Sequence, residues 1–546
     1  MRIKFGLPGD LADPGSAGVI LQSILALCLP VVACEPSACC GCFRQCFNLI
    51  VRLVRPAVRR FKYRLNRANK TTEKQKAGNG RRASGAFAVP HLCLEFAAGI
   101  DMAKERSAVN TLLVLLVFAT TLSAPCMAIA QTGSHGRITD AEINRAVDRE
   151  APGMIELRHR VHQHPELSNR EFETSKLVAE HLRSLGLEVQ TGIAHTGVVG
   201  VLRGGRPGPV VAVRSELDAL PVTEMNSLPF KSTVRTTYNG QDVGVSHACG
   251  HDIHIAAILG VASVLASMRE RLPGTVMFVF QPAEEGLAAG EQGGAELMLK
   301  EGLFNKLKPD AVFGMHSFGT LDVGQIRYSL GVTGASDANF SIDFHGKQAH
   351  AAYPQESVDP VIMAAETVME LQTIRTRNLA PSDQAVLSVT MVHTGVRVNI
   401  IPDQAKLGGT IRTFDDKVEA KIERRMSEIA QSIAQGAEGS AELQFYDRVP
   451  VLMSDPALVQ RMLPALDRAL GSSNVMLSPP VMAADDFAYF GQVAPAFFFF
   501  LGTQKPGTTS GINHASSFQA EDSSIPVGMR AMSQVLVEYL QTTSAH

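Results

Sequence analysis

The sequence predicts an α/β fold, a mixed and mainly parallel sheet between helices, with a smaller α+β domain inserted into it. Two observations predict this fold. Apolar runs of strand length alternate with helical segments before residue 331 and again after residue 446. Between these parts the order becomes strand, helix, strand, strand, helix, which suggests a ferredoxin-like arrangement. We therefore expect one domain built from residues 140–331 and 447–546, and a second built from residues 332–446.

The first part of the larger domain begins with two helices, one starting at Asp140 and one over Glu173–Leu185, where apolar residues recur at helical spacing. Strands and a buried helix follow. The strands are expected at Gly197–Leu202, Val210–Val213, Val276–Phe280 and Ala311–Met315, and the buried helix at Ile255–Met268.

The inserted domain and the closing part follow the same rules. In the inserted domain, strands are expected at Asn339–Phe344, Ala385–Val392 and Lys406–Arg412, with helices at Asp359–Arg375 and Lys417–Gly436. After residue 446, a helix at Ala457–Leu470, a strand at Ala496–Leu501 and a closing helix at Ser524–Leu540 return to the α/β pattern.

Charge and cysteine are unevenly distributed along the 546 residues, whose formal net charge is −2. Residues 1–130 carry 17 Lys and Arg against 7 Asp and Glu, and residues 131–546 carry 34 against 46. Eight of the nine cysteines lie in residues 1–130, which leaves Cys249 alone in the acidic body. The acidic charge argues against nucleic acid as a partner, and a single cysteine excludes a disulfide scaffold.

Residues 102–130 have the order of a secretory signal peptide. Lys104 and Arg106 precede the apolar stretch Thr111–Ala124, and Ala128-Ile129-Ala130 supplies small residues for cleavage. The sequence therefore predicts export, to the periplasm or out of the cell. We interpret the basic, cysteine-rich residues 1–101 as lying upstream of the true start at Met102. The alternative is a membrane anchor, which would also result from an uncleaved signal peptide.

The densest group of reactive side chains is His247-Ala248-Cys249-Gly250-His251-Asp252-Ile253-His254. Imidazole and thiolate are preferred ligands of zinc and similar divalent ions, and a nearby carboxylate can orient a ligating ring. The alternative is a set of polar residues at the start of a helix. Cys249 as a nucleophile is a further alternative, but a thiol between two histidines is better suited to bind metal.

Other polar side chains follow the predicted strands, where α/β proteins place their sites. Glu284 and Glu285 follow Val276–Phe280, His316 ends the strand after it, and Asp218 follows Val210–Val213. The glutamate pair alone would more often be part of a solvated loop, and a single histidine at a strand end is weak evidence. The sequence has no HExxH helix, GxSxG elbow, P-loop or GxGxxG fingerprint.

These motifs, in this order, resemble the amidohydrolase branch of the aminoacylase and carboxypeptidase-G-like metallopeptidases, which includes hippurate hydrolase and auxin-conjugate hydrolases. The resemblance extends from about residue 142 to residue 540. It is carried by RHRVHQHPELS (158–168), HACGHDIH (247–254), PAEEG (282–286), GKQAHAAYP (346–354), NIIPD (399–403), GTIRTF (409–414) and INHASSF (512–518).

The resemblance implies a di-metal aminopeptidase-like catalytic domain with an inserted lid and dimerisation domain, and hence a homodimer or higher homo-oligomer. It implies two divalent ions, zinc or manganese, with cobalt or nickel as further options. The matching metal ligands are Cys249, His251, Glu285, His316 and His514. Glu284 matches the general base, His350 the residue that stabilises the oxyanion, Asp218 and Asp252 carboxylates that steer ligand histidines, and Asn399 and Arg412 residues that hold the substrate carboxylate.

Two segments depart from the family pattern. The family usually has Arg-Ala-Asp-Met-Asp where residues 214–218 read Arg-Ser-Glu-Leu-Asp, and Gly-x-Glu-Asp-Phe where residues 483–487 read Ala-Ala-Asp-Asp-Phe. Glu216 and Asp485 keep the charge but move each carboxylate by one methylene. We expect these exchanges to affect the geometry around the metals, the metal preference or the substrate fit.

The resulting prediction is an exported, metal-dependent amidohydrolase that cleaves the amide of a small-molecule N-acyl amino acid, with hippurate-like substrates favoured. The first alternative is a dipeptidase or aminopeptidase that uses the same metals on a free N-terminus. The second is a catalytically silent binding protein that keeps the fold, against which the intact Glu284 and ligand set argue.

Overall fold

The computed structural model describes residues 136–543, with the exception of residues 289 and 510. The predicted signal peptide and the 1–101 extension lie outside this range. Within it, no helix has both the length and the hydropathy needed to cross a bilayer.

Eight strands form one mixed sheet in the order β1-β2-β6-β3-β7-β18-β8-β17. The strands from β6 through β3 and β7 to β18 are parallel, as are β8 and β17, and the other neighbours are antiparallel. Their bounds are β1 (Glu188–Ile193), β2 (Gly197–Arg203), β3 (Arg206–Glu216), β6 (Pro273–Gln281), β7 (Ala311–Asp322), β8 (Ile326–Tyr328), β17 (Val475–Leu477) and β18 (Ala496–Gln504). The mainly parallel sheet predicted from the sequence is confirmed.

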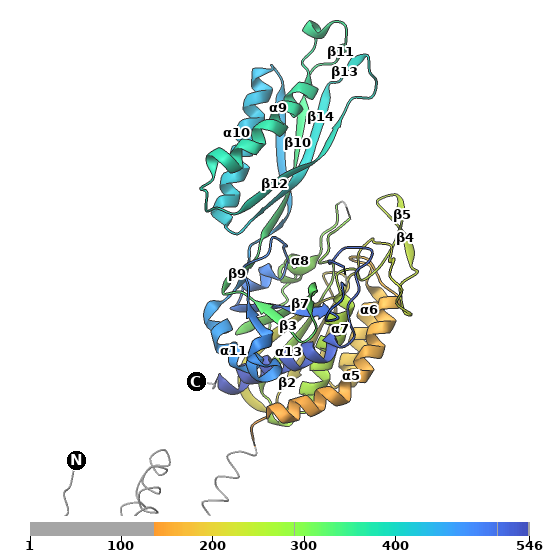
Figure 1. The fold of residues 1–546 in the computed structure, drawn as a ribbon, viewed down its shortest axis with the longest axis vertical. Helices are drawn as coiled ribbons and strands as arrows, with labels where there is room; N and C mark the ends of the chain where they lie inside the picture. Colours follow the sequence, from red (N-terminus) through yellow and green to blue (C-terminus); the bar gives the residue numbers. More distant parts are fainter. Residues whose placement is uncertain (1–135, 289, 510, 544–546) are drawn as a thin grey trace, which may run out of the picture. The chain divides into compact units, whose positions relative to one another are not determined.

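Helices cover both faces of this sheet (Figure 1). One face packs against α5 (Asp140–Gln163), α6 (Phe172–Ser184), α7 (His251–Ala266), α11 (Pro456–Leu470) and α13 (Ser524–Thr542). The other packs against the shorter α8 (Gly294–Lys300) and α12 (Ala488–Gly491). The helix α5 begins with a capping box, in which the side chains of Thr139 and Glu142 each bond the backbone N–H of the other.

The core lies on both sides of the central strands because successive side chains of a strand point to opposite faces. In β18, Phe497 and Phe499 belong to one hydrophobic cluster, while Phe498 and Phe500 belong to the other. Each such burial stabilises the fold by roughly 1.5–3 kcal/mol. The run of phenylalanines is therefore the sequence of a central strand that is covered on both faces.

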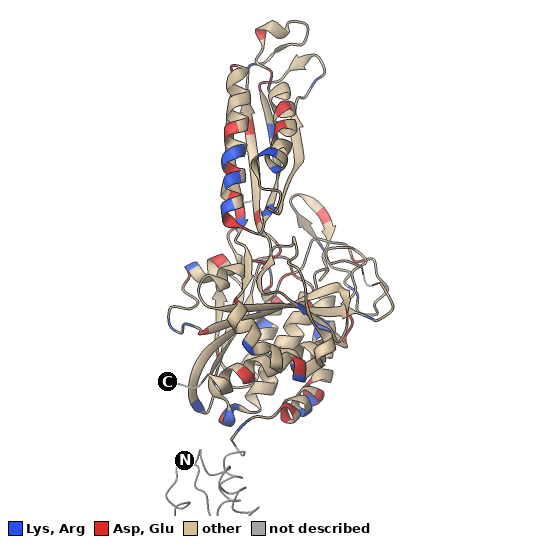
Figure 2. Cartoon of the chain, turned by 60° about the vertical axis from the view of Figure 1, so that its left-hand side comes forward, with Lys and Arg blue, Asp and Glu red and all other residues tan. Residues whose placement is uncertain are grey.

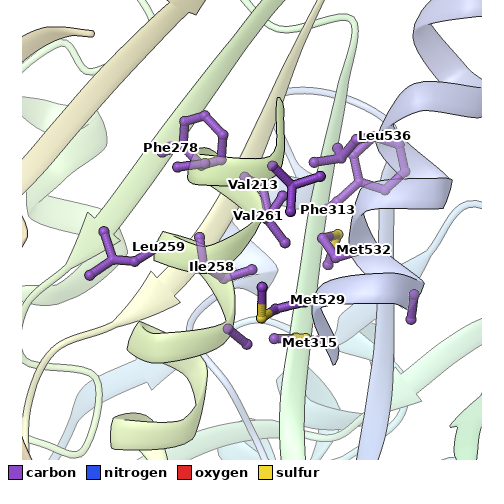
Figure 3. Packing of buried hydrophobic residues seen from close by; sticks show 14 of the residues in the cluster. Val213, Ile258, Leu259, Val261, Phe278, Phe313, Met315, Met529, Met532 and Leu536 are labelled. Carbon is purple, nitrogen blue, oxygen red and sulfur yellow. The ribbon is translucent and has the colours of Figure 1, made fainter. Parts of the chain in front are cut away.

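Close packing of α7 against α13 completes the larger cluster. Figure 3 shows Met529 of α13 between Ile258 of α7 and Met315 of β7. A Cβ atom placed on Gly260 would lie only 2.6 Å from Met529 Cε. Gly260 thus allows the two helices to approach, and α7, which begins at the candidate site, is held firmly in the core.

A second, antiparallel sheet has the order β12-β14-β10-β15. Its strands are β10 (Ser336–His345), β12 (Ala385–Thr394), β14 (Gln404–Thr413) and β15 (Ser440–Val449), and its helices are α9 (Pro360–Thr373) and α10 (Asp416–Gly436). The chain order, strand-helix-strand-strand-helix-strand, is ferredoxin-like. These elements enclose a hydrophobic cluster of their own, and α10 carries acidic and basic residues in its part from Asp416 to Glu428 (Figure 2).

Several short elements complete the structure. They are the strand pairs β4 (Arg235–Tyr238) with β5 (Gln241–Gly244), β9 (Gly331–Gly334) with β16 (Leu452–Ser454) and β11 (Ala349–His350) with β13 (Ile400–Ile401), the 3₁₀ turns Arg269–Arg271, Pro354–Glu356 and Ser472–Asn474, and the π turn Ile374–Asn378.

Candidate metal centre and active site

The start of α7 places Cys249 and His251 together. Gly250 caps the helix with φ = +87°, a left-handed conformation that residues with a side chain adopt only at a cost. A Cβ atom at this position would lie 2.3 Å from Ser317 Oγ. Glycine therefore permits both the sharp entry into the helix and the contact with β7. The helix begins four residues before the predicted start at Ile255, so that His251 and His254 lie in its first turn.

The loop after β6 carries Glu284 and Glu285. Ala283 immediately precedes them in a left-handed conformation, with φ = +52°. The backbone N–H of Glu285 donates to Asp218 Oδ2 at 2.9 Å. The two glutamate side chains are about nine-tenths buried, with exposed fractions of 10% and 6%. The loop thus holds both carboxylates in a largely water-excluded position.

Two further histidines reach the same place from distant segments. His316 lies within β7, and His514 lies in the loop after β18. The backbone N–H of His514 donates to Ala248 O at 2.8 Å, and Asn513 Nδ2 donates to Cys249 O and Ser317 O at 3.1 Å each. Asn513, which sequence reasoning did not select, thereby ties the closing loop to the Cys249 loop.

The five predicted ligands and Glu284 form one cluster. Cys249 Sγ lies 3.4 Å from His316 Nε2 and 3.2 Å from His514 Nε2. Glu285 lies 3.3 Å from His514 and 3.7 Å from His251, measured between carboxylate oxygen and Nε2. The Nε2 atom of His251 is also 3.8 Å from Glu284 Oε2. A thiol, three imidazoles and two carboxylates therefore converge from four segments.

The donor atoms fit divalent metal ions. His251 Nε2 and Glu285 Oε1 are both buried, and neither has a hydrogen-bond partner among the described residues. Burial, with Glu285 and Glu284 next to it, raises the pKa of the Cys249 thiol well above its usual value. An isolated thiol in this setting is a poor nucleophile, whereas a cation between these donors would stabilise the thiolate and satisfy the unpartnered atoms.

Glu284 has the properties of a proton carrier. Burial, together with Asp485 and Glu285, raises the pKa of Glu284 well above its usual value. A carboxylate whose proton affinity is raised in this way accepts a proton more readily than an ordinary glutamate does.

Arg214 binds the residues that depart from the family pattern. Its guanidinium is 1% exposed and forms ion pairs with Glu216, with Asp485 at 3.0 Å and with Asp486 at 2.9 Å. Its Nε also donates to Gln281 Oε1 at 2.9 Å. Glu216 and Asp485 thus share one buried cation. The sequence indicated both carboxylates, but the role of Arg214 was missed because Asp485 is 271 residues away from it.

Glu216 also orients a histidine that is not a free ligand. His254 Nδ1 is 2.8 Å from Glu216 Oε2, and its Nε2 accepts the backbone N–H of Ser317 at 2.6 Å. Both ring nitrogens are therefore occupied, although the ring lies only 4.7 Å from that of His316. His254 supports the wall behind His316 and is not available to a metal.

The two carboxylates expected to steer ligand histidines differ. His251 Nδ1 is 2.8 Å from the backbone oxygen of Asp218 and 3.5 Å from its carboxylate, so Asp218 does lie behind a ligand histidine. Asp252 instead binds Arg158 Nε at 2.7 Å and His162 Nδ1 at 2.9 Å. The expectation for Asp252 is corrected: its side chain points into the contact between α5 and α7, because it lies one residue beyond His251 on the helix.

A cavity of 410 Å³ opens beside the cluster. Cys249, Glu284, Glu285, His316 and His514 form its polar end. Apolar side chains from β7, β15, β16, β18 and nearby loops also line it: Phe318, Val449, Leu452, Val481, Phe498, Phe500 and Ile512. The lining further includes the acidic Asp485 and Asp486.

Arg412, for which the resemblance implied a role in holding the substrate carboxylate, also lines this cavity. Its Nη1 lies 3.1 Å from Asp337 Oδ2, so its charge is partly balanced. Asp337, a second cavity residue, was not selected from the sequence.

His350 and Asn399 lie together but not in this cavity. They belong to the β11–β13 pair, where His350 faces Ile400 and the N–H of Ala351 donates to Asn399 O at 3.1 Å. Both residues are exposed, and neither is among the residues that line the cavity. The structure therefore groups these two predicted residues with each other and not with the metal ligands.

Comparison with known proteins identifies this arrangement. Residues 212–538 match the profile of peptidase family M20/M25/M40. The chain belongs to this family. It is 37% identical to thermostable carboxypeptidase 2 of Saccharolobus solfataricus over 390 residues, which cover 71% of this chain and 95% of that protein. It is 36% identical to an N-acetylcysteine deacetylase of Bacillus subtilis, with 71% and 97% covered.

A solved structure supports the same assignment. A Bacillus subtilis protein described as a dinuclear metal-binding peptidase of the M20 family superposes with a TM-score of 0.60 at 33% identity, covering 72% of this chain and 99% of that one. The predicted family resemblance is confirmed. The chain is an M20-family hydrolase of amide bonds, and its donor set fits two divalent ions.

Proposed function

We propose that this M20 hydrolase cleaves the amide bond of N-acyl amino acids and releases a carboxylic acid and an amino acid, with hippurate-like compounds as substrates. The cavity carries this proposal, because a single space joins the metal ligands, an apolar wall and Arg412. An apolar acyl group would pack against Phe498 and Phe500. The substrate carboxylate would bind Arg412 in competition with Asp337.

The chain's own residues would act as follows. Cys249, His251, Glu285, His316 and His514 would hold two divalent ions, zinc or manganese, with cobalt or nickel as further options. When bound, these ions would polarise the amide carbonyl and acidify the attacking water.

Glu284 would take the proton of that water and deliver it to the departing amine nitrogen, which makes the amine a better leaving group. Its raised pKa suits both transfers. His350 is proposed to stabilise the oxyanion and Asn399 to hold the substrate carboxylate, which requires the β11–β13 pair of this or another copy to reach the metal ligands during turnover. His350→Ala should then lower kcat without a loss of bound metal.

The test is hydrolysis of N-benzoylglycine and a panel of N-acetyl amino acids by protein reconstituted with Zn, Mn, Co or Ni. We expect release of the free amino acid. We expect Glu284→Gln to keep its bound metal and to lose about 10²–10⁴-fold in kcat, the usual contribution of a general base. Near wild-type turnover by this variant would exclude the proposed role, and inactivity of the wild-type protein on the whole panel would exclude the proposed substrate class.

A peptidase acting on a free N-terminus is the second candidate, and one observation favours it. Asp337 lines the cavity, and its Oδ1 has no hydrogen-bond partner among the described side chains. A carboxylate oxygen in this position could accept a hydrogen bond from the ammonium group of a substrate. Unblocked dipeptides in the same assay separate the candidates, because an amidohydrolase of the proposed kind should prefer the blocked substrates.

Location and assembly belong to the proposal as well. The signal-peptide pattern of residues 102–130 supports an exported enzyme, and sequencing the N-terminus of the mature protein would test cleavage after residue 130. Dimerisation is proposed through residues 332–446. The edge strand β12 exposes Val386, Met391 and Val392 by 40%, 51% and 57%, which is unusual for large apolar side chains on one strand. Light scattering of the purified protein would test this assembly.

A further inference from the structure

A buried carboxylate outside the metal cluster contacts the loop that carries the proposed general base. Glu171 is the residue before α6 and is 0% exposed. Its Oε1 accepts the backbone N–H of Ala283 at 2.9 Å, and its Oε2 accepts the Thr196 hydroxyl at 2.6 Å. Among the residues that the structure describes, Glu171 forms no ion pair. Burial and the nearby Asp218 raise the pKa of Glu171 to about 7.

The conformation of Ala283 needs support of this kind. With φ = +52° it is left-handed, which is unfavourable for a residue with a Cβ and persists only where the surroundings determine it. On the same loop, the backbone N–H of Glu285 donates to Asp218 Oδ2 at 2.9 Å. Two buried carboxylates therefore bind the amides on either side of Glu284.

We propose that Glu171 is a positioning residue: by accepting the Ala283 N–H it fixes the left-handed turn that directs Glu284 toward the metal ligands. This inference rests on the proposed role of Glu284 as the base. Glu171 begins a helix whose Val178 and Leu182 are fully buried, so the carboxylate is presented from a rigid element. A displacement of about 1 Å in a catalytic group can cost about 10²-fold in rate, so a hydrogen bond of this kind can decide turnover.

Three substitutions test the inference in the full-length protein with N-benzoylglycine as substrate. Glu171→Ala removes the acceptor and should lower kcat by about 10²-fold, with KM and bound metal unchanged. Glu171→Gln should stay within about threefold of wild type, because its amide oxygen still accepts the Ala283 N–H and the Thr196 hydroxyl can turn to accept the new NH₂ group. Ser175→Ala is the matched control. It removes the hydrogen bond from the Ser175 hydroxyl to the backbone oxygen of Thr196, the residue that also bonds Glu171, and it leaves the Ala283 N–H and its acceptor in place. This variant should keep the wild-type kcat.

A double variant separates positioning from general stability. Glycine adopts a left-handed conformation without the steric penalty, so Ala283→Gly in the Glu171→Ala background should recover about tenfold in kcat. The assay is run well below the unfolding transition of each variant, so that a change in global stability does not alter the folded fraction and a recovered kcat reports on the turn itself. Wild-type kcat in Glu171→Ala, an equal loss in Ser175→Ala, or loss of metal from Glu171→Ala would each overturn the inference.

Hydrogen exchange provides a readout that does not depend on activity. In Glu171→Ala, a peptide covering residues 280–287 should exchange faster than in wild type, while peptides from α6 should be unchanged. If the wild-type protein hydrolyses none of the substrates, the proposed function fails and this measurement still decides the role of Glu171. Unchanged exchange in residues 280–287 would overturn the inference even in a fully active enzyme.

Discussion

Removal of the Arg214 side chain is expected to be among the most damaging single changes in the chain. The guanidinium is 1% exposed and forms ion pairs with three carboxylates, those of Glu216, Asp485 and Asp486. Arg214→Met leaves these carboxylates buried without a cation. Breaking a buried ion pair in this way costs about 3–5 kcal/mol, because the remaining charge stays desolvated.

The matched control is Arg203→Met. Arg203 also lies on a strand of the central sheet and pairs with Glu188 at 2.7 Å, but both side chains are more than half exposed. Such surface pairs contribute about 0–1 kcal/mol. The two variants thus make the same chemical change in a buried and an exposed setting, and the difference between them isolates the effect of burial.

The assay is urea unfolding followed by far-UV circular dichroism, since the chain has no tryptophan. Measurement in EDTA keeps metal binding from adding to the apparent stability. Even with Arg214 present, burial raises the pKa of Asp486 to about 7. In Arg214→Met, the pKa values of these carboxylates should be higher in the folded state than in the unfolded state. The variant should therefore lose stability as the pH rises from 5 to 8. Equal small losses in both variants, or a loss independent of pH, would refute the reasoning.

Three other outcomes are expected. Cys249→Ala should bind less metal after dialysis, measured by elemental analysis; wild-type metal content would exclude Cys249 as a ligand. Gly250→Ala should lower metal affinity and thermal stability, because its Cβ would overlap Ser317 Oγ at 2.3 Å in a left-handed turn; an unchanged melting temperature would contradict this. The pKa of Glu171 is about 7 in the folded protein, compared with 4.5 for a free glutamate side chain. Ionisation of Glu171 therefore destabilises the folded state as the pH rises between these two values. The free energy of unfolding of Glu171→Gln, measured with urea relative to wild type, should therefore increase by on the order of 3 kcal/mol between pH 4.5 and pH 7.5. A difference that does not change with pH would contradict the raised pKa of Glu171.

The sequence predicted those features that are encoded in contiguous residues. HACGHDIH and PAEEG each bring several reactive side chains into one short segment, so the candidate metal ligands in them could be selected from the sequence. Long, strongly apolar elements such as α7 and β18 were also predicted. The strands β8 and β17 were not, because three residues are too few to show a period. β15 was missed because most of its residues are only half-buried or exposed.

Contacts between distant segments could not be predicted in the same way. The pairing of Arg412 with Asp337 requires the register of β10 and β14, where these two residues face each other. The bond from Ala283 to Glu171 spans 112 residues and depends on a left-handed alanine that no sequence rule would suggest. The different surroundings of Asp218 and Asp252 likewise follow from where each backbone segment enters the site and not from residue type.

The position of β18 has a consequence for how the chain folds. β18 lies between β7 and β8, although only residues 323–325 separate those two strands in the sequence. This part of the sheet therefore stays open until residues 496–504 have left the ribosome, and closing so long a loop slows folding. A chain that ends earlier would expose two unpaired apolar strand edges, which invite aggregation. Since His514 follows β18, we expect the metal centre to assemble only after β18 has taken its place in the sheet.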